Sequence, residues 1–559
     1  MKKYFLLLCI AALALAGCNK DGGKASAITV DFTISKNPCR AQEEVTFMAK
    51  LTGGKAPFNC TWELFNQKTS AKMATLTGET AAYTFETNGT VAVKLTVTDA
   101  AGSSAQRQKN LVVNPAPVPE TDNITLHWAA KIDGYTSISS VAIADDGSIY
   151  ATSRARKLYK FNASGVKQWD QVIFNASDAE SAVWTIPSID EDGTVYVGGG
   201  TKSPDGCYVA FNPDGSKKWT FTDFFTTGDK LPTVTGILAG IDGDHIYIGN
   251  TGTTGSVISI NKADGTRAGF CKHGDGGPVG GARTGIAISN KGTIHWYGGE
   301  YGAFGMDKSV LDAAATGGDY NWRMYGEAPE RAKMSAMCPL TLTTIDDRSA
   351  LVGMVTDQIG VRVYALDVTN GNQISSTYID DTYDQDQGGV VITPEGYAVA
   401  SLCYELGAEN GGIAIVDLAQ GQVLARYRVQ EKVSGSAAID AAGNIHFGTE
   451  DGFYYIVKYA SGEFTLLAKM NLARLIVSKY SASEYDYHAN KDGALTGKIW
   501  NSVVIGDDGK MYCIVTDEDT RGWSALVCLG FEGCTGPGNT SWPMVGHDRR
   551  HTNKQLIVR

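Results

Sequence analysis

The sequence of 559 residues lacks the short motifs that usually mark a catalytic centre. It has no adjacent pair of cysteines, no Cys-x-x-Cys pair of the kind that holds zinc or haem, and no Gly-x-Ser-x-Gly nucleophile motif. The net charge of −11 gives no basic excess, which argues against a nucleic acid partner. Proline is scarce, with 15 residues, whereas glycine, with 65, is frequent enough for many tight turns. We therefore predict no metal site, no cofactor and no nucleic acid partner.

The N-terminus predicts the compartment. Two lysines precede an apolar run, Phe5–Ala16, that is too short to span a bilayer as a mature helix and has the layout of a signal peptide. The following Leu-Ala-Gly-Cys resembles the bacterial lipobox, in which the cysteine is diacylated; an ordinary secretory signal is the alternative. The resemblance implies a signal peptide over residues 1–18, a lipid anchor at Cys18 and a tether over residues 19–27.

The dipeptide Lys20-Asp21, just after this cysteine, resembles the surface-export signals of Bacteroidetes lipoproteins. The resemblance implies a protein of the cell envelope, anchored in the outer membrane and exposed on the cell surface.

Residues 28–114 are predicted to form a first domain of short strands. Alternating apolar residues occur in Val45–Leu51 and Val91–Asp99, and several short strands in fewer than about 100 residues favour an antiparallel sandwich. The Tyr-Thr-Phe that begins at Tyr83, followed by Val-x-Leu-Thr-Val-Thr-Asp, resembles the PKD domain, an immunoglobulin-like module of cell-surface proteins. The resemblance implies a spacer or a weak binding unit.

Three side chains of this first domain carry further predictions. Trp62 is interpreted as a core residue rather than a ligand platform. Cys39 and Cys60 are the candidates for a disulfide in an oxidising compartment, and the other cysteines are interpreted as small buried side chains. A proline-rich linker over residues 115–123 follows.

A repeated pattern of short strands and tight turns fills residues 124–535. It is clearest in residues 185–221, where Asp-Gly turns separate apolar runs and Trp219 lies in the last run. The glycine of the first hairpin recurs at Gly147, Gly193, Gly243, Gly292, Gly396, Gly443 and Gly509. A degenerate copy of this hairpin lies at Asp346-Asp347. This spacing predicts an all-β chain whose second domain is an eight-bladed β-propeller. The strand around Leu126–Ile132 is predicted to complete the last blade, which removes an open sheet edge.

These repeats resemble the PQQ-like repeats of quinoprotein dehydrogenases and of the outer-membrane assembly lipoprotein BamB. The segment that begins Trp542-Pro-Met is similar to one that often accompanies such propellers, and residues 536–559 are predicted to pack on the propeller. Its His547, Asp548 and His551 are interpreted as packing residues, with a metal cluster as the alternative. Quinoprotein dehydrogenases stack PQQ on a disulfide between adjacent cysteines and hold Ca²⁺ beside it; the cysteine pair is missing from this sequence.

The irregular loops between the repeats are the predicted binding surface. In a propeller, the loops that enter each first strand gather on one face, and aromatic residues beside carboxylates suit a glycan or a protein partner. The candidate contacts are Trp184, His273, Arg331, Tyr383, Asp384, Asp386, Tyr485, Tyr487, His488 and Trp500. The alternative for each aromatic residue is that it packs its loop onto the barrel.

The predicted function is that of a non-catalytic binding or scaffold protein of the cell envelope. A PQQ-dependent dehydrogenase and a glycoside hydrolase or lyase are the alternatives, although no pair of catalytic carboxylates is assigned. The stretch Asp384–Gly388 has some features of a Ca²⁺ loop but lacks the glutamate that such a loop needs.

Overall fold

The computed structural model describes residues 27–555 except 68, 87–88, 115–118, 137–138, 176–182, 184, 201–205, 225–236, 250–256, 272–283, 298–301, 325–337, 357–359, 381–387, 403–410, 481–496 and 517–522. The chain folds into two compact units, which divide between Val118 and Pro119. No helix in the described part of the chain is long and apolar enough to cross a membrane.

Unit 1 is built from two sheets. One has the order β1 (Thr29–Ile34), β3 (Glu44–Thr52), β6 (Thr80–Thr84), and the other has the order β2 (Cys39–Arg40), β8 (Ser104–Asn114), β7 (Gly89–Thr98), β4 (Asn59–Asn66), β5 (Lys72–Thr77). Trp62 on β4 is fully buried, packs edge-to-face on Phe32 with ring centroids 5.1 Å apart, and donates its indole N–H to the Gly78 carbonyl at 2.9 Å. Its predicted role as a core residue is confirmed.

The predicted disulfide between Cys39 and Cys60 is wrong, because both thiols are free and buried. Cys39 lies on β2 and Cys60 on β4, and the strands β8 and β7 lie between them in the sheet. Neighbouring strands are about 4.8 Å apart, so these two strands are about 14 Å apart, far beyond the reach of a disulfide. Burial raises the pKa of both thiols, which act as small apolar core side chains.

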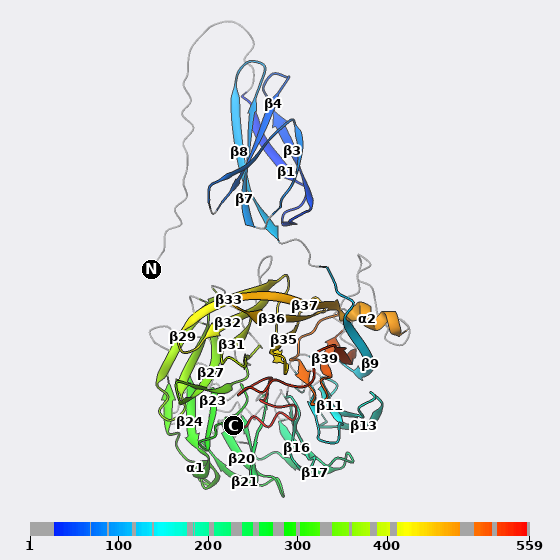
Figure 1. The fold of residues 1–559 in the computed structure, drawn as a ribbon, viewed down its shortest axis with the longest axis vertical. Helices are drawn as coiled ribbons and strands as arrows, with labels where there is room; N and C mark the ends of the chain where they lie inside the picture. Colours follow the sequence, from blue (N-terminus) through cyan, green and yellow to red (C-terminus); the bar gives the residue numbers. More distant parts are fainter. Residues whose placement is uncertain are drawn as a thin grey trace. The chain divides into compact units, whose positions relative to one another are not determined.

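Unit 2 contains eight four-stranded antiparallel sheets among the described residues, and Figure 1 shows them arranged around a common centre. The first four are β10 (Ala142–Ile143), β11 (Ile149–Ser153), β12 (Lys157–Phe161), β13 (Lys167–Val172); β14 (Ser188–Ile189), β15 (Val195–Gly199), β16 (Cys207–Phe211), β17 (Lys217–Phe221); β18 (Gly240–Asp242), β19 (His245–Gly249), β20 (Val257–Asn261), β21 (Arg267–Phe270); and β22 (Ala287–Ile288), β23 (Thr293–Tyr297), β24 (Ala303–Asp307), β25 (Trp322–Met324).

The remaining four sheets follow the same order from first to fourth strand. They are β26 (Thr341–Ile345), β27 (Arg348–Thr356), β28 (Val361–Asp367), β29 (Gln373–Asp380); β30 (Val390–Ile392), β31 (Ala398–Leu402), β32 (Gly411–Asp417), β33 (Gln422–Val429); β34 (Ala438–Ile439), β35 (Asn444–Gly448), β36 (Phe453–Ala460), β37 (Glu463–Asn471); and β38 (Val504–Ile505), β39 (Met511–Thr516), β40 (Trp523–Phe531), β9 (Ile124–Asp133). Two short helices interrupt this order: α1 (Lys308–Asp312) connects β24 to β25 within one sheet, and α2 (Leu472–Lys479) follows β37, before the last sheet begins.

The last sheet is completed by the first strand of unit 2, as predicted. The strand β9 pairs antiparallel with β40, from Ile124 opposite Phe531 to Asp133 opposite Trp523. The first and last strands of the ring of sheets are therefore joined in one sheet, and β9 does not form a sheet of its own. The degenerate hairpin is confirmed as well, since Asp346 and Asp347 turn the chain between β26 and β27 with φ angles of 47° and 64°.

Tryptophans on fourth strands pack neighbouring sheets together. The indole of Trp169 covers Gly215 in the next sheet and donates its N–H to the Pro213 carbonyl at 3.2 Å. The same arrangement joins Trp128 to Gly165, Trp219 to Gly265 and Trp322 to Gly371. A Cβ at any of these glycines would come within 3.1 Å of the ring, so the turn must be glycine for the indole to pack.

The C-terminal segment from residue 536, hereafter the tail, is hydrogen-bonded to the first strands. The backbone N–H of one isoleucine on β10, β14, β18, β22, β30 and β34 donates to a tail carbonyl: Ile143 to Arg549, Ile189 to Arg550, Ile241 to Thr552, Ile288 to Asn553, Ile392 to Trp542 and Ile439 to Pro543. Figure 1 shows the tail, in dark red, near the centre of the ring of sheets. The end of the sheets that carries these contacts and the first hairpin turns is called the tail end; the opposite end, where the chain enters each first strand, is called the loop end.

Candidate functional site

The structure describes one of the ten predicted contact residues. Trp184, His273, Arg331, Tyr383, Asp384, Asp386, Tyr485, Tyr487 and His488 lie outside the described residues, as does the predicted lipid-attachment residue Cys18. Trp500 is described, and it lies at the loop end in the connection that leads into β38.

Trp500 is half-buried and belongs to a row of alternating aromatic and cationic side chains. Its ring packs edge-to-face on Tyr135, with centroids 6.3 Å apart, and the Arg154 guanidinium lies 4.7 Å from the centre of the Tyr135 ring. On the other side, the Lys498 ammonium lies 5.2 Å from the centre of the Trp500 ring. We call Arg154, Tyr135, Trp500 and Lys498 the aromatic–cation row.

The last sheet, through β9 and β38, and the first sheet, through β11, position this row. Tyr135 follows β9, Arg154 follows β11, and Lys498 and Trp500 precede β38, so each residue occupies a connection at the loop end. The Arg154 N–H donates to the Tyr135 carbonyl at 3.0 Å, which ties two members together through the backbone. Below Tyr135, the buried Thr136 N–H donates to the Ser524 hydroxyl at 3.0 Å. The row is thus fixed by hydrogen bonds to the sheets.

Carboxylates lie at the lysine end of the row. The Lys498 ammonium is 3.3 Å from Glu450 Oε2, and both side chains are less than one-fifth exposed. Beside this pair, burial raises the pKa of Asp451 above its usual range, although the Thr449 hydroxyl donates to that carboxyl. Positive charge, aromatic rings and acids therefore meet in a small area. Such a surface suits recognition of a ligand.

Sequence reasoning missed Tyr135, Arg154 and Lys498. Tyr135 and Trp500 are hundreds of residues apart in the sequence and meet only because β9 closes the last sheet. Tyr135, Arg154 and Lys498 each lie close to a strand end, and strand ends of one polarity gather on one face of a propeller. The sequence could therefore have predicted the row if the closing strand had been used to decide which connections share the loop end.

The tail histidines serve packing rather than a shared site. The His551 Nδ1 donates to the Pro187 carbonyl at 3.0 Å, and burial lowers the His551 pKa to about 4, so the ring is neutral. Asp548 accepts a hydrogen bond from the Thr552 hydroxyl at 2.6 Å and lies 3.5 Å from His547 Nδ1. Within the described residues, His547, Asp548 and His551 do not converge on one point that could hold a cation.

One buried group of possible metal ligands is present in the described chain: Asp440, His446 and Cys534, with ligand atoms within 4.8 Å of one another. The Asp440 carboxylate already accepts hydrogen bonds from the Asn444 backbone and side chain, at 2.8 Å each, and lies 3.0 Å from His446 Nε2. Burial raises the Cys534 pKa to about 12, so the thiol is protonated. A similar pair, Asp190 and Tyr196, closes another first hairpin at 3.4 Å. These contacts identify the group as a hairpin closure.

The sequence and the fold resemble those of known propeller proteins. The family described as "Outer membrane protein assembly factor BamB" matches residues 119–269. No curated protein matches the sequence. Among solved structures, a europium-containing methanol dehydrogenase is 12% identical with a TM-score of 0.54, covering 74% of this chain and 95% of that chain. Quinohemoprotein alcohol dehydrogenase from Comamonas testosteroni is 14% identical with a TM-score of 0.53, covering 73% of this chain and 76% of that chain.

The resemblance to quinoprotein dehydrogenases extends to the fold but not to the disulfide platform of their cofactor. All eight cysteines among the described residues are free and buried, and none has a cysteine as its neighbour in the sequence. At 12–14% identity, likeness of fold does not transfer an activity. The chain is therefore an all-β protein with a β-propeller unit, in which residues 119–269 match the BamB family.

Proposed function

We propose that this protein is a non-catalytic, lipid-anchored protein of the cell envelope whose propeller binds a protein partner at the loop end. The eight four-stranded sheets are taken as eight blades, and unit 1 as an immunoglobulin-like spacer between the anchor at Cys18 and the propeller. The outer membrane is the proposed location, in agreement with the BamB family match over residues 119–269.

The aromatic–cation row is the observation that carries this proposal. Tyrosine, tryptophan and arginine are the residues that most often dominate the binding energy of protein interfaces. Here one of each is held in a contiguous row by neighbouring sheets, and the rings are half-buried rather than packed into the core. A row that is already positioned before binding loses little conformational entropy when a partner docks. The described residues next to it offer acids and a lysine for complementary charges.

A glycan is the second candidate ligand, since a half-exposed indole can stack on a sugar face and carboxylates can accept hydrogen bonds from hydroxyls. The row favours a protein partner because its two cations lie against the ring faces and reduce the free aromatic surface available for stacking. A redox enzyme is a weaker alternative, because none of the described cysteines supplies the missing adjacent pair. Titration with PQQ and Ca²⁺ tests it directly, and stoichiometric binding would favour that alternative.

Site-specific photo-crosslinking in the producing cells tests the proposal. A photoreactive amino acid at Ala155, next to Arg154, is expected to crosslink one protein, and the Trp500→Ala change in the same chain should abolish that product. The matched control position is Ser164, an exposed residue in the turn between β12 and β13 at the tail end. Equal crosslinking from both positions would contradict the proposal. Binding to a glycan array without any protein product would favour the glycan candidate.

The anchor is tested separately by Cys18→Ala. The proposal expects the wild-type chain in the membrane fraction and the variant in the soluble envelope fraction, because several acyl chains hold a protein stably and none remains in the variant. Membrane association that survives the change would contradict the assignment of Cys18 but leave the loop-end site untouched.

A further inference from the structure

A cavity opens at the tail end, at a first strand that the tail does not pair with. Six first strands donate a backbone N–H to a tail carbonyl, but no tail group accepts one from β26 among the described residues. The carbonyls that bind the two neighbouring first strands come from distant parts of the tail, Trp542 for β30 and Asn553 for β22. The repeated contact is therefore interrupted at β26.

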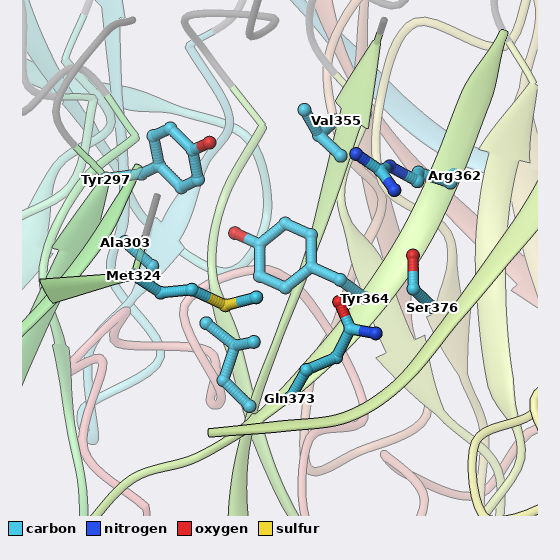
Figure 2. A pocket seen from close by; sticks show the side chains of 9 residues that line it. Tyr297, Ala303, Met324, Val355, Arg362, Tyr364, Gln373 and Ser376 are labelled. Carbon is cyan, nitrogen blue, oxygen red and sulfur yellow. The ribbon is translucent and has the colours of Figure 1, made fainter. Parts of the chain in front are cut away.

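The cavity at this interruption is large enough for a small ligand. Its volume is about 350 Å³, within the range of roughly 300–1,000 Å³ for ligand sites. By contrast, the space beside Tyr364, between the sheets β22–β25 and β26–β29, measures only about 30 Å³, room for about one water molecule. Figure 2 shows the side chains of Tyr297, Met324 and Tyr364 reaching into that smaller space. Of these two cavities, the one at β26 can hold a ligand.

Strand register provides one hydrogen-bond donor on the β26 side. Both β18 and β26 end in two-residue turns, and Thr344 of β26 occupies the position of Ile241 in β18, one residue before the pair that closes the turn. The Ile241 N–H points away from its own sheet and donates to the Thr552 carbonyl at 2.9 Å. Thr344 lines the cavity, and its N–H has no hydrogen-bond partner among the described residues.

Gln555 provides a second donor on the opposite side of the cavity. Its side chain is 4% exposed, and its Oε1 accepts a hydrogen bond from the Asn290 N–H at 3.4 Å. A backbone N–H can only donate, so this contact fixes the orientation of the amide, with the oxygen facing Asn290 and the NH₂ group turned away. That NH₂ group has no partner among the described residues. A buried donor without a partner is costly, which points to an acceptor in the cavity.

The walls of the cavity are polar but carry no charge. Side-chain amides and hydroxyls surround two apolar side chains, Ile392 and Pro394. The Ser541 hydroxyl donates to Thr343 Oγ1 at 2.8 Å, so the proton of the Thr343 hydroxyl is left for another acceptor. None of the described residues that line the cavity is ionisable, so an ion would lose its hydration there without a compensating charge. The walls therefore suit an uncharged ligand with several oxygen atoms.

We propose that this cavity binds a neutral monosaccharide. Oxygen atoms of the sugar accept hydrogen bonds from the Thr344 N–H and the Gln555 NH₂ group, and sugar hydroxyls donate to the side-chain oxygens of the walls. The C–H face of the ring contacts Ile392 and Pro394. A sugar ring combines several hydroxyls and an apolar face without a charge, and the walls offer groups that match each of these features. The site is separate from the aromatic–cation row and does not depend on the protein partner proposed there.

Ligand-observed NMR titration of the purified protein with D-glucose, D-galactose and D-mannose tests the proposal. The matching uronate of each hexose, which carries a carboxylate on a ring of the same shape, is the charged analogue. We expect at least one hexose to bind with a Kd of about 10 mM or lower. Its uronate should bind at least about 5-fold more weakly, because no cation among the described lining residues faces the carboxylate.

Two variants remove one donor each. Thr344→Pro deletes the backbone N–H on β26, an edge strand in which proline is tolerated, whereas the matched variant Thr344→Val keeps that N–H. Gln555→Met keeps the length of the side chain and deletes the amide. Thr344→Pro and Gln555→Met should each weaken hexose binding about 5-fold, because each loses one hydrogen bond to the sugar. Thr344→Val should bind the hexose more tightly than Thr344→Pro.

The control variant is Gln420→Met, which changes an exposed glutamine in the turn between β32 and β33, outside the cavity, and should bind the hexose as the wild type does. The proposal is overturned if none of the three hexoses binds at concentrations up to about 50 mM, if the uronate binds equally well, or if Gln555→Met keeps the wild-type affinity. Melting temperatures show whether each variant has folded, and Gln555→Met decides the outcome if Thr344→Pro has not.

Discussion

The two ends of the sheets in unit 2 are built differently. At the tail end, the same contact recurs: in six sheets an isoleucine N–H of the first strand donates to the tail. At the loop end, the members of the aromatic–cation row each occur once, in connections of different length and sequence. A contact that repeats around the ring fixes geometry, whereas a residue that departs from the repeat is free to serve recognition. This difference places structure at the tail end and the proposed binding at the loop end.

Removal of the tail should have the largest effect. Residues 536–559 include the fully buried Trp542 and Met544, and Arg549 joins the hairpin turns of the last and first sheets through Asp507 and Asp145, each at 2.8 Å. Loss of one buried tryptophan alone costs about 3–5 kcal/mol. We expect the chain truncated after residue 535 to lose cooperative thermal unfolding, measured by circular dichroism. A truncated chain with the wild-type melting temperature would contradict the claim that the tail stabilises the sheets at the tail end.

Trp219→Ala should destabilise the protein far more than Trp500→Ala. The indole is 8% exposed, donates to the Lys262 carbonyl at 2.9 Å and covers Gly265 of the next sheet. We expect a decrease of about 3–4 kcal/mol in the free energy of unfolding, measured with urea, against less than about 1 kcal/mol for the half-buried Trp500→Ala. Equal losses at the two sites would mean that Trp500 is also a packing residue.

Acid should destabilise the fold in part through a buried histidine of the tail. Burial lowers the His551 pKa from 6.5 to about 4, although the Pro187 carbonyl and the Asp548 charge oppose this shift. Between these pH values the unfolded chain binds one more proton at this residue, so the free energy of unfolding falls as pH decreases from about 6.5 to about 4. The expected loss is about 3 kcal/mol. It is measured by urea unfolding at several pH values.

The His551→Gln variant provides the comparison for this pH effect. His295, whose pKa burial lowers to about 3, titrates over the same range and should keep its share of the slope in the variant. The variant should therefore lose only part of the acid dependence. An unchanged slope would show that His551 is already charged in the folded protein.

The parts of this molecule that repeat in the sequence are the parts that the sequence predicts. The turn glycines and the Trp169 and Trp219 strands recur, so their spacing predicts the sheets, and the leftover strand before Gly134 predicts the closure by β9. The Cys39–Cys60 prediction failed because nearness in the sequence does not reveal strand order. Tyr135 and Arg154 were missed because they reach Trp500 only after the ring closes. The other nine predicted contacts lie outside the described residues and stay predictions.

The affinity for the partner, measured for one variant at the loop end and one variant away from it, tests most directly whether the loop end binds the partner. Once crosslinking at Ala155 has identified the partner, its dissociation constant is measured for the wild type, Trp500→Ala and Tyr459→Ala, a half-buried tyrosine on the third strand β36. We predict that Trp500→Ala weakens binding at least about 10-fold with little change in stability, and that Tyr459→Ala leaves the affinity within about twofold. Undiminished affinity of Trp500→Ala would contradict the assignment of function to the loop end.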